Sequence, residues 1–341
     1  MPRADDTASQ FTFISPRREL LAAAALTAAA APFGRAARAQ SATAWPSQPV
    51  RWINPYPAGG PTDTLSRIYC AKMSAIAGQQ FVVENRSGSG GNVGALAIAR
   101  SAPDGTTFGL GGIASNAIAP TLYPSLPFDP EKDFTFVSGL WRLPNLLIVN
   151  LDLPVRSVPE LIDLLKRNPG RYSFGSAGSG TTIHLSGELF KQHAGVDILH
   201  VPYRGSAPAL VDLLAGRIHM IFDNIPTALA LSREQKVRPL AVTTRQRSPV
   251  VPDLPSMSEF LPGFDMTSWT CACGPAGLPR PIVERMAELT RKALESPDLI
   301  ESFRGHGADI FPTTPEEIAA YRAAEQARLA PLIRASGARV D

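Results

Sequence analysis

Two glycine-rich turns decide the fold of this chain: Tyr56-Pro-Ala-Gly-Gly-Pro-Thr-Asp63 and Phe174-Gly-Ser-Ala-Gly-Ser-Gly-Thr-Thr-Ile-His184. Each turn follows a short apolar run that is typical of a strand and leads into a helical pattern. Glycine lets the backbone approach a ligand closely, and the exposed N–H groups and dipole at a helix start favour an anion. The second turn lacks the lysine that a nucleotide-binding loop carries before its threonine. The two turns therefore predict cradles for small carboxylates rather than for ATP.

Strand and helix patterns alternate from residue 50 onward, which predicts an α/β fold with mainly parallel sheets. The predicted strands of a first sheet are 50–54, 81–84, 107–110 and 264–273, and those of a second sheet are 172–174, 198–201 and 218–222. The predicted helices are 62–77, 95–101, 158–167, 181–193, 207–215, 279–295, 297–305 and 315–336. The extended segments 134–150 and 238–244 predict two crossings between the sheets.

We therefore predict two α/β lobes joined by two extended crossings. In this prediction lobe 1 consists of residues 45–142 and 246–341, and lobe 2 consists of residues 143–245. A chain of 341 residues is long enough for two domains of ordinary size. Ligands of such folds bind in the crevice at the carboxyl ends of the strands. Because each lobe has one glycine-rich turn at such an end, the pattern predicts a hinge-closing clamp.

Residues 1–39 are typical of an export signal. Arg17 and Arg18 precede an alanine-rich apolar run, and Ala37-Arg38-Ala39 supplies small residues at the −3 and −1 positions of a cleavage site. The apolar run is too short to span a bilayer. The paired arginines and the mild apolar region favour a twin-arginine signal over a general secretory one. Either signal predicts that the mature protein is exported, after cleavage near Ala39.

The charge balance argues against nucleic acid as a partner. Residues 1–39 hold five arginines against three acidic residues, a net +2, so the formal +3 of the chain falls to +1 after cleavage. No basic stripe interleaved with aromatic residues remains. Any anion selectivity must therefore be local.

Three cysteines, Cys70, Cys271 and Cys273, are too few for a disulfide framework. We predict buried free thiols, although Cys70 could pair with one of the other two in an oxidising compartment. No histidine or acidic residue accompanies them at the spacing of metal ligands. We therefore expect no metal and no cofactor.

The motifs also occur as an ordered set that covers essentially the whole chain after the export signal. The set comprises Tyr56-Pro-Ala-Gly-Gly-Pro-Thr-Asp63, Glu84-Asn-Arg86, Gly90-Gly-Asn-Val-Gly94, Pro103-Asp-Gly105, the run from Phe174 to Phe190, Val201-Pro-Tyr-Arg-Gly-Ser-Ala-Pro-Ala-Leu210, Asp212-Leu-Leu-Ala-Gly216 and Pro275-Ala-Gly-Leu-Pro279. This set resembles the Bug-type substrate-binding receptors of tripartite tricarboxylate transporters.

The resemblance implies a periplasmic solute receptor of the Venus-flytrap type, with a fold like that of type II periplasmic binding proteins and no enzyme activity. Such receptors clamp a small carboxylate or related metabolite and pass it to a membrane permease or to a sensor. We expect a monomer. The resemblance implies ligand contacts at Tyr56, Ala58, Gly59, Gly60, Thr62, Asp63, Ser176, Ala177, Gly178, Gly180, Thr181 and His184. The chain departs from many relatives at Cys271 or Cys273, where they have a larger apolar residue, and in its export signal.

Some of these residues also have a purely structural interpretation. Asp63 could serve only as a helix cap, and an isolated histidine such as His184 is more often a structural hydrogen-bonding residue. The hydroxyls of Ser179, Thr181 and Thr182 could donate to a carboxylate, which only accepts. Further candidates at predicted strand ends are Ser115, Asn116, Arg204 and Asp223, and the aromatic residues that could line a pocket for the ligand's tail are Tyr56, Trp141, Phe222 and Trp269. Arg204 could instead form a salt bridge on the rim.

Two other functions remain open at this point. A serine hydrolase could use Ser176 or Ser179 with His184, but the G-x-S-x-G elbow is absent at both serines and no acidic partner for the histidine can be placed. A ligand-dependent sensor subunit that docks to a signalling receptor would share every motif above. The sequence favours a transport receptor that is not an enzyme.

Overall fold

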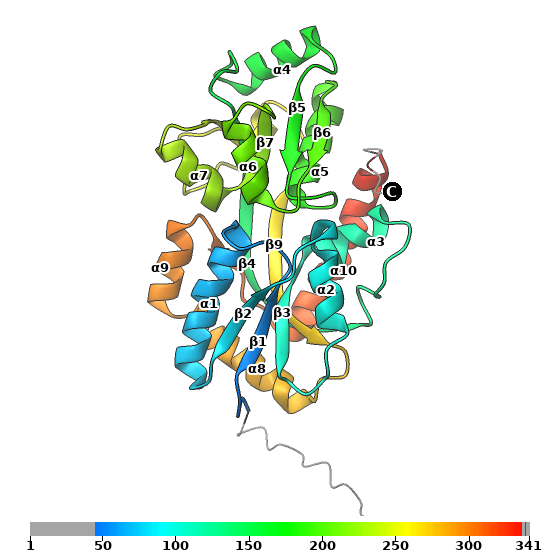
Figure 1. The fold of residues 1–341 in the computed structure, drawn as a ribbon, viewed down its shortest axis with the longest axis vertical. Helices are drawn as coiled ribbons and strands as arrows, with labels where there is room; N and C mark the ends of the chain where they lie inside the picture. Colours follow the sequence, from blue (N-terminus) through cyan, green and yellow to red (C-terminus); the bar gives the residue numbers. More distant parts are fainter. Residues whose placement is uncertain (1–44, 336–337, 339–341) are drawn as a thin grey trace, which may run out of the picture. The chain divides into compact units, whose positions relative to one another are not determined.

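The computed structural model describes residues 45–335 and 338, so the predicted export signal at residues 1–39 lies outside the described part of the chain. Among the described residues, no helix is both long enough and apolar enough to cross a membrane. Two groups of parallel strands are joined through a central antiparallel region, and Figure 1 shows the two groups at opposite ends of the long strand β4 (Phe134–Val149).

The first part of the chain forms the predicted βαβαβ unit. Strands β1 (Val50–Asn54), β2 (Phe81–Asn85) and β3 (Thr107–Gly112) pair in parallel in the order β2-β1-β3. Helices α1 (Pro61–Ala77) and α2 (Asn92–Ala99) connect them, with a short turn η2 (Ser89–Gly91) before α2. Leu65, Tyr69 and Met73 are spaced to lie on one face of α1, and all three are buried in the core between α1 and the sheet.

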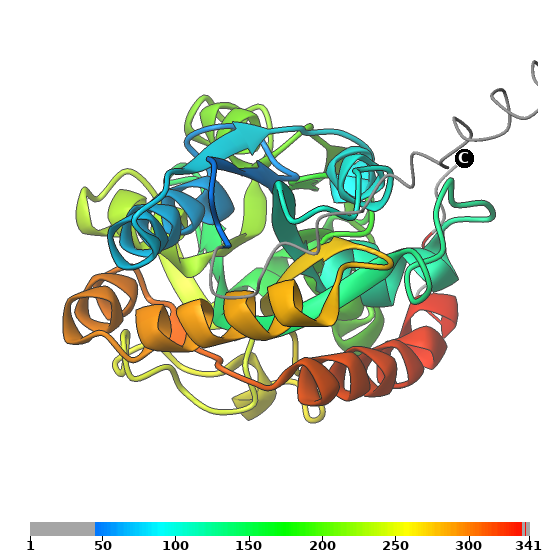
Figure 2. The same ribbon diagram turned by 90° about the horizontal axis from the view of Figure 1, so that it is seen from below.

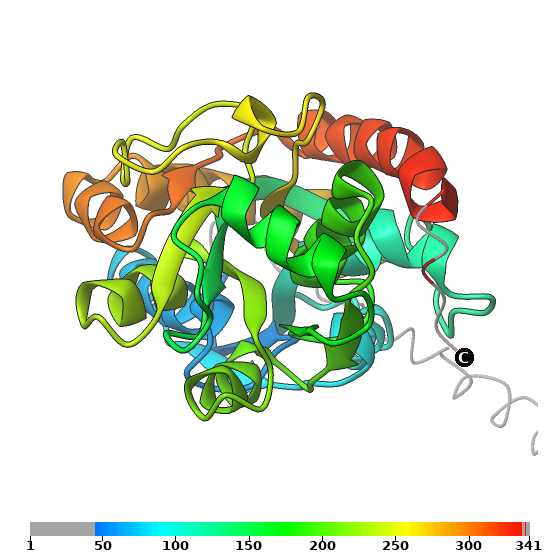
Figure 3. The same ribbon diagram turned by 90° about the horizontal axis from the view of Figure 1, so that it is seen from above.

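The middle of the chain forms the second parallel group. Strands β5 (Ser173–Ser176), β6 (Leu199–Pro202) and β7 (Met220–Asn224) pair in the order β7-β5-β6. The helices of this part surround the strands in Figure 3 and are α4 (Val158–Arg167), α5 (Thr182–Ala194), α6 (Ser206–Leu214) and α7 (Ile225–Arg233). The sequence patterns predict all of them except α7.

The central region corrects the prediction of mainly parallel sheets. β4 is one continuous strand of 16 residues and carries the chain from the first group to the second. Its first part, residues 134–144, pairs with β9 (Thr267–Pro275), and its last part pairs with β7 and with β8 (Arg238–Val242). Every one of these pairings is antiparallel. For β8 and β9 the reason is that they return to the lobe that β4 leaves, and so run opposite to β4.

The return crossing is longer than the sequence predicts. β8 ends at Val242, and the next residue, Thr243, donates its backbone N–H to the carbonyl of Asn145 in β4 at 2.9 Å. Met266 in turn donates to the carbonyl of Thr243 at 3.0 Å, and β9 continues along β4 from there. β8 and β9 therefore form the second crossing end to end, with residues 244–265 as an excursion that contains the short helix η4 (Met257–Glu259). The fold thus consists of two α/β lobes joined by two extended crossings, as predicted.

The last part of the chain covers the first sheet. Helices α8 (Arg280–Leu294), α9 (Pro297–Gly305) and α10 (Pro315–Ala335) follow one another along one side of the molecule in Figure 2. The short strand β10 (Asp309–Ile310) pairs with β4. α8 packs against α1, where Tyr69 Oη and Thr290 Oγ1 lie 2.7 Å apart in a buried hydrogen bond. α8 therefore belongs to the same lobe as α1.

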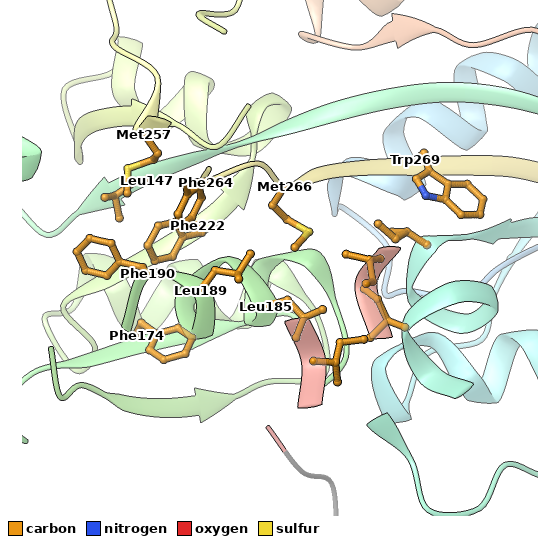
Figure 4. Packing of buried hydrophobic residues seen from close by; sticks show 14 of the residues in the cluster. Leu147, Phe174, Leu185, Leu189, Phe190, Phe222, Met257, Phe264, Met266 and Trp269 are labelled. Atoms are coloured by element: carbon orange, nitrogen blue, oxygen red, sulfur yellow. The ribbon is translucent and has the colours of Figure 1, made fainter. Parts of the chain in front are cut away.

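The cores lie on both faces of the sheets. Figure 4 shows part of the core around α5, where the rings of Phe190 and Phe222 have centroids 5.6 Å apart. Cys271 and Cys273 of β9 belong to this core, whereas Cys70 belongs to the core on the opposite face of the first sheet. All three cysteines are buried free thiols, which confirms the prediction and excludes the alternative pairing of Cys70.

Candidate functional site

A cavity lies between the two lobes and is lined by both of them. The cavity has a volume of about 50 Å³, which suits a small molecule or a few waters. Lobe 1 contributes the turn after β1, the end of β3 and the start of β9, and lobe 2 contributes the ends of β5 and β7 and the starts of α5 and α6. The polar lining residues and the glycines among them are Tyr56, Gly60, Thr62, Gly111, Gly112, Ser115, Thr181, Thr182, Ser206, Asn224, Ser268 and Thr270. Both predicted turns therefore face one shared site.

Three helices begin at this cavity. Thr62 of α1, Thr182 and Ile183 of α5, and Ser206 and Ala207 of α6 all line it. The first N–H groups of a helix have no partner inside the helix, and no backbone carbonyl of the described residues accepts from these five. None of the described residues that line the cavity has a charged side chain, so the attraction that these residues exert on an anion comes from backbone amides and helix dipoles.

The turn after β1 is held by hydrogen bonds from side chains that do not line the cavity. Asn54 and Asn85 donate their side-chain N–H groups to the carbonyl of Tyr56, at 3.1 and 2.9 Å. Asp63 accepts from the backbone N–H of Gly59 at 2.9 Å and from Arg67 at 3.0 Å. Burial favours a higher pKa for Asp63, but the hydrogen bonds from Arg67, Gly59 and Asn85 lower it overall. Asp63 therefore shapes the turn and does not line the cavity, and it is not the cap of α1, whose N-cap residue is Gly60.

The second turn rests on a pair of stacked histidines. His184 accepts from the backbone N–H of Gly180 through Nδ1 at 3.2 Å, and its ring lies 4.2 Å from that of His200. His200 Nε2 and Ser176 Oγ are 2.7 Å apart, and Ser176 also accepts from the N–H of Gly178 at 3.2 Å. Burial lowers the pKa of His184 to about 3 and that of His200 to about 4. Both rings thus stay neutral and support the turn, and the sequence patterns did not reveal His200.

Thr181 corrects one predicted role. Its hydroxyl accepts from the N–H of His184 at 3.3 Å and donates to the carbonyl of Gly178 at 2.8 Å. The hydroxyl is therefore fully occupied as the cap of α5 and has no proton left for a ligand carboxylate. Thr182 Oγ1 lies 3.5 Å from Asn145 Oδ1, at the outer limit of a hydrogen bond, so its proton is held only weakly. The donors that the α5 turn offers are thus its backbone amides and the hydroxyl of Thr182.

The two lobes touch directly beside the cavity. Gly90 of lobe 1 lies against Gly178 and Ser179 of lobe 2, so closely that a Cβ on Gly90 would stand 2.2 Å from the carbonyl oxygen of Ser179. Tyr123 of lobe 1 donates its hydroxyl to that same carbonyl at 3.1 Å. Gly205 approaches Pro57 in a third contact. The structure is therefore a closed arrangement of the two lobes.

The predicted site residues divide into two groups. Those that line the cavity are Tyr56, Gly60, Thr62, Ser115, Ala177 and Thr181. Those that the structure places outside the lining are Ala58, Gly59, Asp63, Asn116, Ser176, Gly178, Gly180, His184, Arg204 and Asp223. Some residues of the second group hold lining residues by hydrogen bonds. Asn116 Oδ1 accepts from Ser115 Oγ at 2.7 Å, and Asp223 accepts from Ser206. Arg204 is exposed and does not line the cavity.

The aromatic candidates divide in the same way. Tyr56 and Trp269 line the cavity, whereas Trp141 and Phe222 are fully buried in the two cores. Sequence reasoning missed Ser206, Ala207 and Asn224. Gly205-Ser206 follows a strand and opens a helix, which is the same pattern as in the two turns that it did recognise.

The comparisons with known proteins agree with this geometry. A family model described as the tripartite tricarboxylate transporter family receptor matches residues 65–338. The chain belongs to this family. Receptors of the family are periplasmic solute-binding proteins and not enzymes.

Three relatives illustrate the similarity. BugT from Bordetella pertussis is 34% identical over 302 residues, which cover 88% of this chain and 93% of BugT. An R. palustris protein solved with adipate is 38% identical with a TM-score of 0.85, covering 87% of this chain and 100% of that structure. MatC from Rhodopseudomonas palustris, solved with malate, is 32% identical with a TM-score of 0.80, covering 85% of this chain and 100% of that structure.

Proposed function

We propose that this receptor is exported to the periplasm, with cleavage near Ala39, and binds a small carboxylate between lobe 1 (45–142 and 246–341) and lobe 2 (143–245) for delivery to the permease of a tripartite transporter. The observation that carries the proposal is the convergence of α1, α5 and α6 on a cavity lined by no charged side chain. Two relatives whose structures contain dicarboxylates support it.

The proposed mechanism is a shift between open and closed arrangements. A ligand that contacts amides of both lobes has more contacts in the closed state, so binding favours closure. Closure removes water, and the hydrogen bonds from the N–H groups to the carboxylate strengthen in the drier site. In this mechanism the permease recognises the closed form.

The amides at the start of α5 offer a direct test. Thr182 is the first residue of α5, and Thr181 before it is extended, with φ −81° and ψ 161°. Proline is well tolerated at the first position of a helix and requires an extended residue before it, and position 182 meets both conditions. Thr182→Pro should therefore remove one N–H donor without breaking the helix. Thr182→Val is the matched control, because it keeps the N–H and loses only the hydroxyl.

Binding is measured by thermal shift and then by calorimetry against a panel of mono-, di- and tricarboxylates, with the corresponding methyl esters as uncharged controls. A hydrogen bond to a charged group contributes about 1.5–3 kcal/mol, so Thr182→Pro should bind the best carboxylate roughly ten- to 150-fold more weakly than Thr182→Val does. Ligand-free wild-type protein that no member of the panel stabilises would count against the proposal, as would equal affinity of the two variants.

A further inference from the structure

One corner of the cavity presents hydrogen-bond acceptors. Ser206 lines the cavity at the start of α6, and its hydroxyl donates to Asp223 Oδ1 at 2.5 Å. Thr227 donates its hydroxyl to the other oxygen of the same carboxylate. Asp223 is completely buried, and an ionised carboxylate accepts only. The proton of Ser206 is therefore held away from the cavity, and the lone pairs of its oxygen are left for a ligand.

Asn224 adds a second acceptor beside Ser206. Its side chain is 94% buried and lines the cavity, and its Nδ2 donates to Asn145 Oδ1. The amide of Asn145 is itself oriented, because its Nδ2 donates to Ser186 Oγ at 3.1 Å and its Oδ1 also accepts from Thr182. Asn224 Oδ1 consequently has no hydrogen-bond donor among the described residues. This oxygen is not among the fully buried unpaired side-chain atoms of the described residues, so it is open to the cavity and can accept from a ligand or from water.

The same corner also supplies donors. The backbone N–H groups of Ser206 and Ala207 open α6 at this position and have no partner inside the helix. A group that complements the corner must therefore accept from the backbone and donate to Ser206 and Asn224. A primary amide or a hydroxyl does both, an ionised carboxylate has no proton to donate, and a ketone likewise only accepts.

We propose that Ser206 and Asn224 make this receptor selective for carboxylates that also carry a neutral hydrogen-bond donor, a primary amide or a hydroxyl. This inference rests on the proposed function, since it assumes that the carboxylate binds elsewhere in the same cavity. It assigns the part of the ligand other than its carboxylate, which the helix N-termini alone do not specify.

Pairs of ligands with the same shape test the proposal on the unaltered protein. Succinamate and levulinate differ only in the exchange of an amide NH₂ for a methyl group, and glutaramate and 5-oxohexanoate form the same pair one carbon longer. Burial raises the pKa of Asp223 to about 6. Calorimetry is therefore done at pH 7.5, which is above this pKa, so that Asp223 is ionised. The amide should bind at least about tenfold more tightly than the ketone at the chain length that fits, since the ketone leaves both acceptors unpaired.

The outcomes separate the two proposals. Equal affinities within each pair would overturn the selectivity proposal and leave the carboxylate proposal standing. Absence of binding by both pairs and by the whole carboxylate panel would overturn both. Tighter binding of the ketones would show that the corner offers donors and would also overturn the selectivity proposal.

Variants identify the residues responsible. Ser206→Ala and Asn224→Ala should each lower the ratio of amide to ketone affinity at least threefold. Ser268→Ala is the matched control, because Ser268 lines the same cavity from β9 and lies outside the corner. Circular dichroism and thermal melting establish that each variant is folded. A ratio that stays at the wild-type value in both corner variants would overturn the assignment.

Discussion

Replacing Gly205 by alanine tests the closed cleft without disturbing either lobe. Gly205 precedes α6 in lobe 2, and its backbone is extended, with φ 164° and ψ 172°, which other residues also adopt. A Cβ at this position would lie 2.7 Å from both Cδ and Cγ of Pro57, in the turn after β1 of lobe 1. The three nearest atoms all belong to Pro57, so the added methyl group collides with the opposite lobe alone.

The size of the collision sets the expected effect. Carbon atoms in contact are ordinarily about 3.5–4.0 Å apart, so the two lobes must separate locally by about 1 Å to admit the methyl group. Overpacking of this kind costs about 1–3 kcal/mol. Because the cost falls on the closed state, Gly205→Ala should weaken ligand binding by roughly five- to 150-fold. The melting temperature of the ligand-free protein should not change.

The assay is calorimetry with the carboxylate that gives the largest thermal shift, together with melting curves without ligand. Gly305→Ala in α9 is the matched control, because a Cβ there meets no atom within 4 Å. Wild-type affinity in Gly205→Ala would refute the idea that binding requires the contact between the lobes seen in the structure. A fall in ligand-free stability that matches the loss of affinity would show that the clash acts on folding instead.

Three further predictions concern the turn, its histidines and the thiols. Tyr123→Phe should weaken ligand binding about two- to tenfold, because the hydroxyl that it removes bonds to the carbonyl of Ser179 in the opposite lobe as well as to that of Ser89 in its own lobe. Calorimetry measures the affinity, and an unchanged value would contradict the prediction. Unfolding free energy should fall by at least about 2 kcal/mol between pH 6.5 and 4, because His184 and His200 stay neutral in the fold while the unfolded chain takes up protons there. Asp223, with its pKa raised to about 6, opposes them but is one group against two; denaturant titrations at each pH test the sum, and a flat or rising profile on acidification would refute it. The three buried cysteines should react with Ellman's reagent only after unfolding, so rapid labelling of the folded protein would be inconsistent with the structure.

The sequence was a good guide to elements whose signals are local. The helix 158–167 matches α4 without error, because Ser157 caps it by accepting from the N–H of Glu160 and Pro159 stands in its first turn. The direction of strand pairing is not a local signal. Whether β4 and β9 pair in parallel or antiparallel depends on how the chain runs between them, over more than a hundred residues. The apolar residues of the two strands do not indicate the direction in which they pair.

The site was predictable only to the level of the backbone. Glycine-rich turns after strands indicated where helices begin at a ligand, and Tyr56, Gly60 and Thr181 do line the cavity. The direction in which a hydroxyl donates was not predictable, because its acceptor comes from another element. Ser206 donates to Asp223, which is 17 residues away, and this single bond decides that the oxygen of Ser206 accepts from a ligand.

A cavity without charged side chains has a consequence for release in the proposed mechanism. A lysine or arginine in the lining would attract the carboxylate in the open state as well as in the closed one, since its charge does not depend on the opposite lobe. Backbone amides at helix starts attract strongly only where water is excluded, because the same interaction is several-fold weaker at the dielectric constant of water. Opening of the contact between Gly205 and Pro57 admits water and weakens every amide contact at once. Affinity is then governed by closure, so a permease that separates the lobes would release the ligand without any change in protonation.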